Sequence, residues 1–244
     1  MLVFGILLLL VVAIRIIILA YRLRKAKGSS VRQKVFSAAE QTTPDLPQGF
    51  GYKCTWIAVR TNDLQKVAEC LKLREVSACN WAAGISKAYD DSVFISPALG
   101  DWIIAAGVNL PAPESTDDVQ EVKKMLAALS LVFGEAQLFS THRVVEYHCW
   151  MRAVEGEVKR VYAFSGEAGE NIVIEGRATR IENQYKLVDT LSEESDQDNY
   201  FDREDLTWPD EELVMEIAGD WSIDPTKLDE LKDTQPALGL VGSL

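Results

Sequence analysis

The hydrophobic pattern divides the chain into a short apolar segment and a longer segment of mixed polarity. Residues 2–21 are predominantly apolar, with Arg15 as the exception. Four cations follow them: Arg22, Arg24, Lys25 and Lys27. About 20 helical residues span the roughly 30 Å hydrocarbon core of a bilayer, and Arg15 is near enough to the end of the run to reach the headgroups. Residues 1–27 are therefore predicted to form one transmembrane anchor with a basic flank.

The charges around the apolar run predict its orientation. The nearby cations follow the run, where a signal peptide would have a small-residue cleavage site. Because cations beside a membrane span stay on the cytoplasmic side, we expect the N-terminus outside and the following domain in the cytoplasm. The predicted location is the cell inner membrane, crossed once, and membrane lipid is the first expected partner.

After the anchor, the pattern indicates a tether and then alternating secondary structure. Residues 28–51 are polar, small and proline-containing, which is typical of a flexible tether. The domain is expected from residue 52 to residue 232. Its first expected elements are a strand at 54–59, a helix at 64–71 capped by Asn62 or Asp63, a helix at 81–89, and a hairpin of 92–96 and 102–108.

The clearest helix is predicted at 116–133, where apolar residues recur every three or four positions from Val119 to Phe133. Ser115 and Asp118 can form a capping box at its start. The strands expected after it are 136–139, 142–153, 158–165 and 171–174. Together these elements predict an α+β domain with a mostly antiparallel sheet and packed helices.

The C-terminal part is predicted to be less regular. Residues 189–212 contain eleven acidic residues and one basic residue, Arg203, so 189–210 is predicted to be a mobile acidic loop. Two short helices are expected next. The first is capped by Thr207 and Asp210 and stops at Gly219, and the second is capped by Asp224 with Leu228 and Leu231 inward. Residues 233–244 are expected to be a frayed tail.

Charge is distributed unevenly along the chain. The whole chain has 25 basic and 37 acidic residues, and residues 1–35 contain seven of the basic ones and none of the acidic ones. Residues 36–244 therefore hold 18 basic and 37 acidic residues, which is a net charge of −19. An acidic surface repels nucleic acid, so no DNA or RNA partner is expected. It would attract a basic protein partner, although net charge can also serve solubility alone.

Cysteines and glycines give no sign of a metal or a cofactor. Cys54, Cys70, Cys79 and Cys149 have no C-x-x-C spacing, so free thiols are expected and no metal site. The glycines at 166 and 169 are flanked by glutamates and are not followed by Gly-Lys-Ser/Thr. A hairpin turn is therefore expected there instead of a phosphate loop, and no cofactor is predicted.

Both histidines, His142 and His148, lie close together with Arg143 and Glu146. If 142–153 is one strand, alternation puts His142, Glu146 and His148 on one face. Six residues at about 3.3 Å each would separate the two imidazoles by roughly 20 Å, too far for one metal ion. Glu146 and His148, about 7 Å apart, could form an acid–base pair. A structural or binding role for this polar strand is the alternative, since no nucleophile can be named.

The tryptophans could fill the core or line a binding surface. Trp56, Trp102 and Trp150 fall within apolar strands and are expected in the core. Trp208 stands beside the acidic loop. It is therefore the best candidate for an exposed contact.

Three segments carry a resemblance to known sequences. Residues 133–135, with the sequence Phe-Gly-Glu, and residues 141–148 and 218–225 resemble a family of uncharacterised bacterial proteins. The similarity covers about residues 52–177 and 211–228. It implies a bacterial source and one coherent domain, and it transfers no site because the family has no established activity. Its members look soluble, so the anchor would be an addition to the same domain.

Three functional hypotheses follow. The leading one is a single-pass membrane-anchored protein whose cytoplasmic domain is a protein-binding module, such as one that neutralises a basic toxin. The competing one is a hydrolase-like enzyme that uses Glu146 and His148, with Arg143 positioning an anion; it requires a concave pocket at that strand. The third is a mainly structural membrane-associated protein. The absence of an assembled catalytic motif favours the first.

Overall fold

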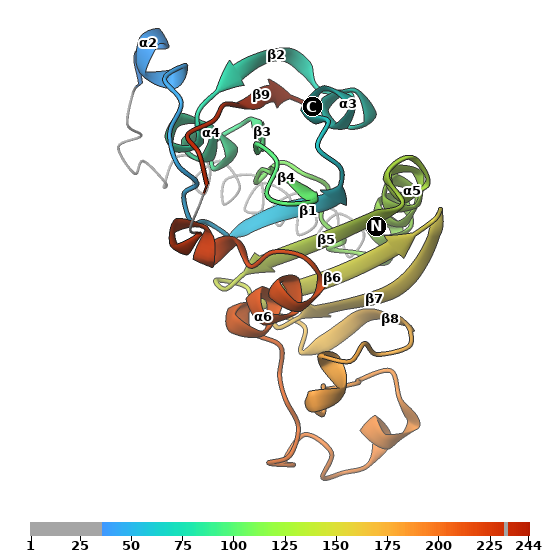
Figure 1. Ribbon diagram of the computed structural model, residues 1–244. Helices are drawn as coiled ribbons and strands as arrows, with labels where there is room; N and C mark the ends of the chain where they lie inside the picture. Colours follow the sequence, from blue (N-terminus) through green and yellow to red (C-terminus); the bar gives the residue numbers. More distant parts are fainter. Residues whose placement is uncertain (1–35, 232–233) are drawn as a thin grey trace, which may run out of the picture. The chain divides into compact units, whose positions relative to one another are not determined.

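One antiparallel sheet of nine strands forms the centre of the part of the chain that the computed structural model describes, residues 36–231 and 234–244 (Figure 1). The strands are β1 (Cys54–Arg60), β2 (Arg74–Cys79), β3 (Val93–Ile95), β4 (Trp102–Ala106), β5 (Glu135–His142), β6 (Tyr147–Val154), β7 (Glu157–Ser165), β8 (Glu170–Gly176) and β9 (Gly239–Ser243). They lie in the order β2-β9-β3-β4-β1-β5-β6-β7-β8. The predicted α+β class with an antiparallel sheet is confirmed.

Helices cover both faces of this sheet. They are α2 (Ala38–Gln41), α3 (Leu64–Cys70), α4 (Trp81–Ala88), α5 (Thr116–Phe133) and α6 (Glu211–Trp221), with the 3-10 turns η1 (Glu182–Gln184), η2 (Glu193–Asp196) and η3 (Pro225–Glu230). On one face, α3 and α5 bury apolar residues such as Leu126 with Ile57 of β1. On the other, Trp81 of α4 and Ile217 of α6 belong to the cluster of Trp56. Consecutive residues of β1 therefore serve opposite cores, as strand alternation requires.

Several elements with a strong local sequence pattern form as predicted. Helix α5 has the predicted bounds, and the Ser115 hydroxyl accepts a hydrogen bond from the Asp118 amide at 3.3 Å. Asp63 caps α3 in the same way, accepting from the Lys66 amide at 2.9 Å. Two later predictions are wrong. Helix α6 does not stop at Gly219 but continues to Trp221, and the side chain of Leu231, which was expected to point inward, is 42% exposed.

The expected frayed tail is wrong, because its end is a strand inside the sheet. β9 pairs with β2 on one side and β3 on the other. Leu240 and Val241 are buried, and a Cβ at Gly239 would lie 2.2 Å from the Ile95 carbonyl oxygen. The close approach of the backbones requires glycine there. β2 was not predicted either, since it is an edge strand with few buried residues.

The expected tether is wrong from Phe36 onward, where the chain packs on the domain. Asp45 accepts hydrogen bonds from the amides of Trp81 and Ala82, at 2.7 and 3.0 Å, at the start of α4. Phe50 is buried in the cluster of Trp56. A carboxylate at a helix N-terminus satisfies free amides and complements the helix dipole, so this segment is part of the fold.

The predicted anchor, residues 1–27, and the first part of the predicted tether, 28–35, lie outside the described residues. Among the residues that are described, no helix combines the length and the apolarity needed to cross a membrane.

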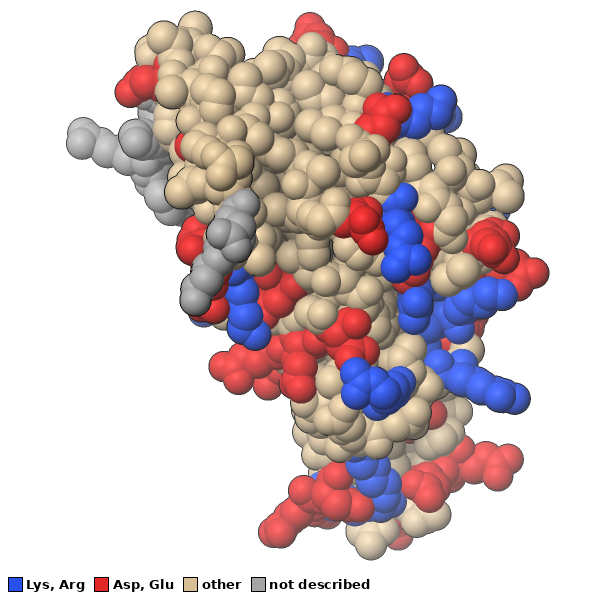
Figure 2. Space-filling model, viewed as in Figure 1, with Lys and Arg blue, Asp and Glu red and all other residues tan. Residues whose placement is uncertain are grey.

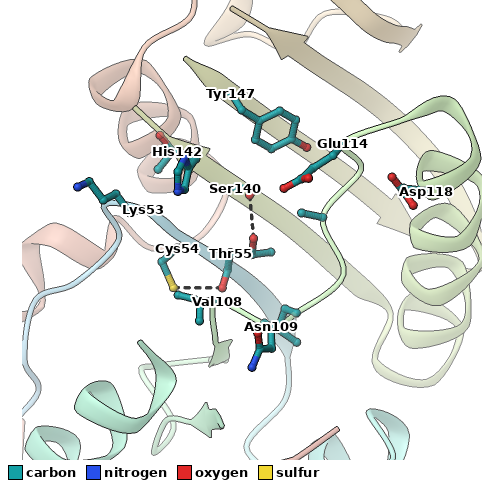
Figure 3. A pocket seen from close by; sticks show the side chains of 13 residues that line it. Lys53, Cys54, Thr55, Val108, Asn109, Glu114, Asp118, Ser140, His142 and Tyr147 are labelled. Carbon is teal, nitrogen blue, oxygen red and sulfur yellow. Dashed lines mark hydrogen bonds between the residues drawn. The ribbon is translucent and has the colours of Figure 1, made fainter. Parts of the chain in front are cut away.

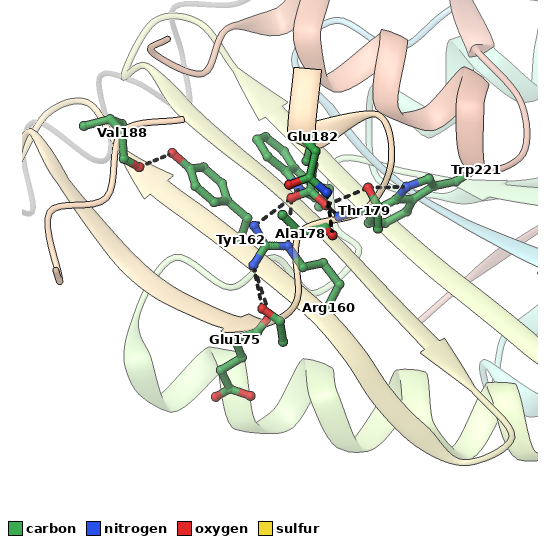
Figure 4. A network of polar contacts seen from close by, with 11 residues as sticks. Arg160, Tyr162, Glu175, Ala178, Thr179, Glu182, Val188 and Trp221 are labelled. Carbon is green, nitrogen blue, oxygen red and sulfur yellow. Dashed lines mark hydrogen bonds and ion pairs between the residues drawn. The ribbon is translucent and has the colours of Figure 1, made fainter. Parts of the chain in front are cut away.

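A buried ion pair fastens the segment after β8 to the sheet (Figure 4). Arg160 of β7 donates from Nε and Nη2 to Glu182 Oε1, each at 2.7 Å, and both side chains are at most 5% exposed. Trp150 Nε1 donates to the same oxygen at 2.8 Å. The amide and hydroxyl of Thr179 donate to Oε2 at 2.8 and 2.7 Å, and Trp221 Nε1 donates to Thr179 Oγ1 at 3.2 Å. The network therefore joins β6, β7, η1 and α6.

Replacing Glu182 by Gln should destabilise the protein strongly. The Arg160 charge would remain buried without its counter-ion, which typically costs about 3–5 kcal/mol. Chemical denaturation of the full-length protein measures the loss. Glu157→Gln is the matched control on β7, because Glu157 pairs with Lys159 in solvent and exposed pairs contribute little. Equal losses in the two variants would contradict the assigned role of the buried pair.

Candidate functional site

The segment that carries both histidines is a hairpin, so the predicted continuous strand 142–153 is wrong. β5 ends at His142, a turn occupies 143–146, and β6 begins at Tyr147. Glu146 adopts φ 49°, a left-handed conformation that reverses the chain. The Gly166 amide holds it by donating to the Glu146 carbonyl at 2.8 Å. The alternating polarity of the segment resembles a strand, although a turn interrupts it.

The hairpin places the two histidines on opposite faces of the sheet, which corrects the prediction of a shared face. His142 is directly opposite Tyr147, and Thr141 is opposite His148. Directly opposed residues share a face and consecutive ones do not. Tyr147 belongs to the core beneath α5, so His142 lies on that face and His148 lies on the face of α6.

Glu146 and His148 do meet, as predicted, although through the turn. His148 Nε2 lies 3.8 Å from Glu146 Oε2, and Nδ1 is hydrogen-bonded to Thr141 Oγ1 at 3.0 Å. His148 is 1% exposed. Burial lowers its pKa, while the carboxylates of Glu146 and Asp210 oppose that shift. The ring is thus enclosed beneath the start of α6, where it supports the hairpin and offers a substrate little access.

Arg143, the fourth candidate, points to the same helix. Its guanidinium is exposed and lies 4.0 Å from the Glu211 carboxylate in the first turn of α6. Together with the Glu146–His148 contact, this pair links the β5–β6 turn to α6. Arg143, Glu146 and His148 therefore gather on the α6 face, and His142 is separated from them.

His142 instead lines a pocket of about 440 Å³ on the α5 face (Figure 3). Lys53, Asn109 and Glu114 are exposed at its mouth. Its floor is buried and consists of Cys54, Thr55, Ser140 and Thr141. Asp118 and Tyr147 complete the polar lining. Of these residues only His142 was proposed as a site residue from the sequence, because the others come from separated segments that share no motif.

The chemistry of the pocket is that of binding groups. Burial raises the pKa of the Cys54 thiol to about 12, so it is neutral and donates to the Thr55 carbonyl at 3.3 Å. Burial also raises the pKa of Tyr147 well above its usual range, and its hydroxyl donates to the Pro113 carbonyl at 3.0 Å. Neither group is an activated nucleophile. Within the described residues, no group of three or more His, Cys, Asp or Glu side chains could hold a metal ion.

A second candidate is the acidic arm, residues 189–210, which was predicted as a mobile loop. Its base is closed by the Thr207 amide, which donates to the Lys186 carbonyl at 2.7 Å, and by the Val188 amide, which donates to the Thr207 carbonyl at 3.0 Å. Tyr200 is buried, and its hydroxyl accepts from the Asp189 amide at 2.9 Å. The arm thus has fixed attachments that the acidic composition does not reveal.

Aromatic side chains are exposed on this arm. Trp208 is 42% and Phe201 50% exposed, and their ring centroids are 6.2 Å apart. Buried Phe164 supports Trp208 at 5.7 Å, and Tyr200 supports Phe201 at 5.1 Å. The predicted exposure of Trp208 is confirmed, and so is the burial of the tryptophans expected in the core: Trp56, Trp102 and Trp150.

The arm that carries the aromatic pair is rich in acidic side chains, and Figure 2 shows acidic side chains projecting at the bottom of the view, where the arm lies. Seven exposed carboxylates lie between residues 193 and 205. Glu194 and Asp205 pair with Arg203. The remaining five make no ion pair within the described residues: Glu193, Asp196, Asp198, Asp202 and Glu204. These five carboxylates could therefore pair with cationic groups of another molecule.

Comparison of the chain with family models, with curated proteins and with solved structures gives no match. The resemblance to a bacterial family therefore stays a prediction, and the two candidate sites depend on their geometry alone.

The burial of His148 predicts a pH-dependent stability. Its pKa is lowered in the folded protein, so the unfolded chain binds the proton more readily and folding favours neutral imidazole. The contribution is complete above the unfolded pKa of about 6.5 and is lost as pH falls below that value. Lowering the pH from 7.5 to 5, about the range of this titration, should therefore decrease the free energy of unfolding less in His148→Gln than in wild type, as measured by chemical denaturation. Identical pH profiles would contradict the burial of a neutral ring.

Proposed function

We propose that the chain is a membrane-anchored binding module whose acidic arm docks a basic segment of another protein. The anchor and the cytoplasmic orientation are inferred from residues 1–27, where an apolar run precedes cations. The observation that carries the proposal is the exposed pair of Phe201 and Trp208 within an acidic surface.

The aromatic pair has the properties of a binding anchor. Large aromatic side chains dominate the energetics of protein interfaces, especially when their partner contacts exclude water. Trp208 and Phe201 rest on the buried rings of Phe164 and Tyr200, so little rotamer freedom would be lost on binding. A preorganised surface costs less to bind than a flexible one.

The unpaired carboxylates specify the charge of the partner. Acidic groups around the aromatic pair favour Lys or Arg and would repel an acidic protein or nucleic acid. The aromatic faces can also receive a cation directly. A partner segment with alternating basic and apolar side chains would use both features, and its association should weaken as salt increases.

The geometry supports the enzyme alternative less well. A hydrolase-like role for Glu146 and His148 requires a concave site at that pair, and the pocket beside the hairpin contains His142 but not Arg143, Glu146 or His148. His148 is also only 1% exposed, which leaves a substrate little access to its ring. The mainly structural alternative predicts that the isolated domain binds nothing at all.

A peptide-display selection against the full-length protein in detergent tests the proposal. Selected peptides should be rich in Lys and Arg. Their affinity should fall by at least about tenfold in a Phe201→Ala/Trp208→Ala double variant, because truncating aromatic anchors of an interface typically weakens binding by more than tenfold. The same binding should decrease in high salt.

Leu131→Ala is the control variant, because Leu131 is exposed, at 72%, and lies on α5 away from the arm. It should bind the selected peptides as wild type does. Enrichment of neutral or acidic peptides, or equal binding by the double variant, would refute the proposed docking surface.

A further inference from the structure

We propose that the pocket beneath α5 binds a small zwitterion that carries an ammonium group at one end and a carboxylate at the other, such as a dipeptide. This site is distinct from the acidic arm, since none of the lining residues belongs to residues 189–210. The proposal rests on the arrangement of charged and polar groups around the cavity (Figure 3).

The pocket has two electrically different ends. In Figure 3, Lys53 and His142 lie on one side, and Glu114 and Asp118 lie on the other. Neither Lys53 nor Glu114 forms an ion pair within the described residues, and both are exposed at the mouth. A ligand carboxylate would meet the Lys53 ammonium, and a ligand ammonium would meet the Glu114 carboxylate.

The centre of the pocket supplies further hydrogen-bonding capacity. Thr55 Oγ1 and Ser140 Oγ are bonded to each other at 2.8 Å. Only one hydroxyl donates in that bond, so the proton of the other can be offered to a ligand. His142 Nδ1 is buried and has no hydrogen-bond partner within the described residues. An unpartnered buried nitrogen costs free energy, which a ligand with a suitable donor or acceptor would recover.

The arrangement selects against ligands of a single charge. A simple anion could pair with Lys53 but would be repelled by Glu114 and Asp118. A simple cation could pair with Glu114 but would be repelled by Lys53. Asp118 has a partner within the described residues, the Ser115 hydroxyl, which donates to its carboxylate at 2.6 Å, whereas Lys53 and Glu114 form no ion pair there. The volume of about 440 Å³ is within the range of small-molecule sites, and the open mouth admits a ligand from solvent.

A matched set of dipeptides tests both ends separately. Alanyl-alanine, its N-acetyl derivative and its C-terminal amide are titrated by ligand-observed NMR into full-length protein in detergent. We expect a Kd on the order of 1 mM or tighter for the free dipeptide and at least about tenfold weaker binding for each blocked form, because each loses one charge-assisted contact.

Two variants assign the binding to this pocket. Lys53→Met should weaken binding of the free dipeptide about tenfold and reduce the difference in affinity between the free dipeptide and its C-terminal amide. Glu114→Gln should weaken binding about tenfold and reduce the difference in affinity between the free dipeptide and its N-acetyl derivative. Lys66→Met and Glu69→Gln, which alter an exposed ion pair on α3, should leave binding unchanged. Because all four positions are at the surface, denaturation of each variant should match wild type.

The proposal is overturned by any of three results. These are no saturable binding of alanyl-alanine in the millimolar range, equal binding of the free and blocked dipeptides, or pocket variants that bind as the α3 variants do. None of these results bears on the acidic arm, which the peptide selection tests independently.

Discussion

The buried ion pair of Arg160 and Glu182 is the constraint on which the C-terminal half of the fold depends. A buried charge is tolerated only when its partner and its remaining hydrogen bonds are present, and here Glu182 accepts from Arg160, Trp150 and Thr179. The chain must therefore return to the sheet directly after β8. From that fixed point it leads into the acidic arm, and through Thr179 it contacts Trp221 of α6.

The antiparallel register determines which side chains can act together. Because the β5–β6 hairpin pairs His142 with Tyr147, one histidine faces the pocket under α5 and the other is enclosed under α6. The pocket therefore receives its polar groups from β1 and the residue before it, from β5 and β6, and from the first turn of α5 and the segment before it. The turn residues instead support α6. The two proposed binding surfaces are consequently built from different residues and can be tested separately.

The sequence predicted the elements whose patterns are local. α5 was found with its caps because apolar periodicity and Ser115 both mark it, and the exposure of Trp208 followed from its acidic neighbours. β9 was missed because its place depends on pairing with strands more than 140 residues earlier. The β5–β6 turn has no glycine or proline, and Glu146 takes the left-handed conformation instead. The pocket could not be predicted, since its lining comes from segments that only the sheet brings together.

The attachments of the acidic arm hold it in one position, in which it presents its aromatic pair. Amide hydrogen exchange in the full-length protein measures whether the arm is held in this way. The amides of Asp189 and Thr190 donate to Tyr200 Oη and Asn171 Oδ1, each at 2.9 Å. Both should exchange far more slowly than in an unfolded chain. Exchange of both amides at the unfolded rate would mean that the arm is a mobile loop that does not hold its aromatic pair in place.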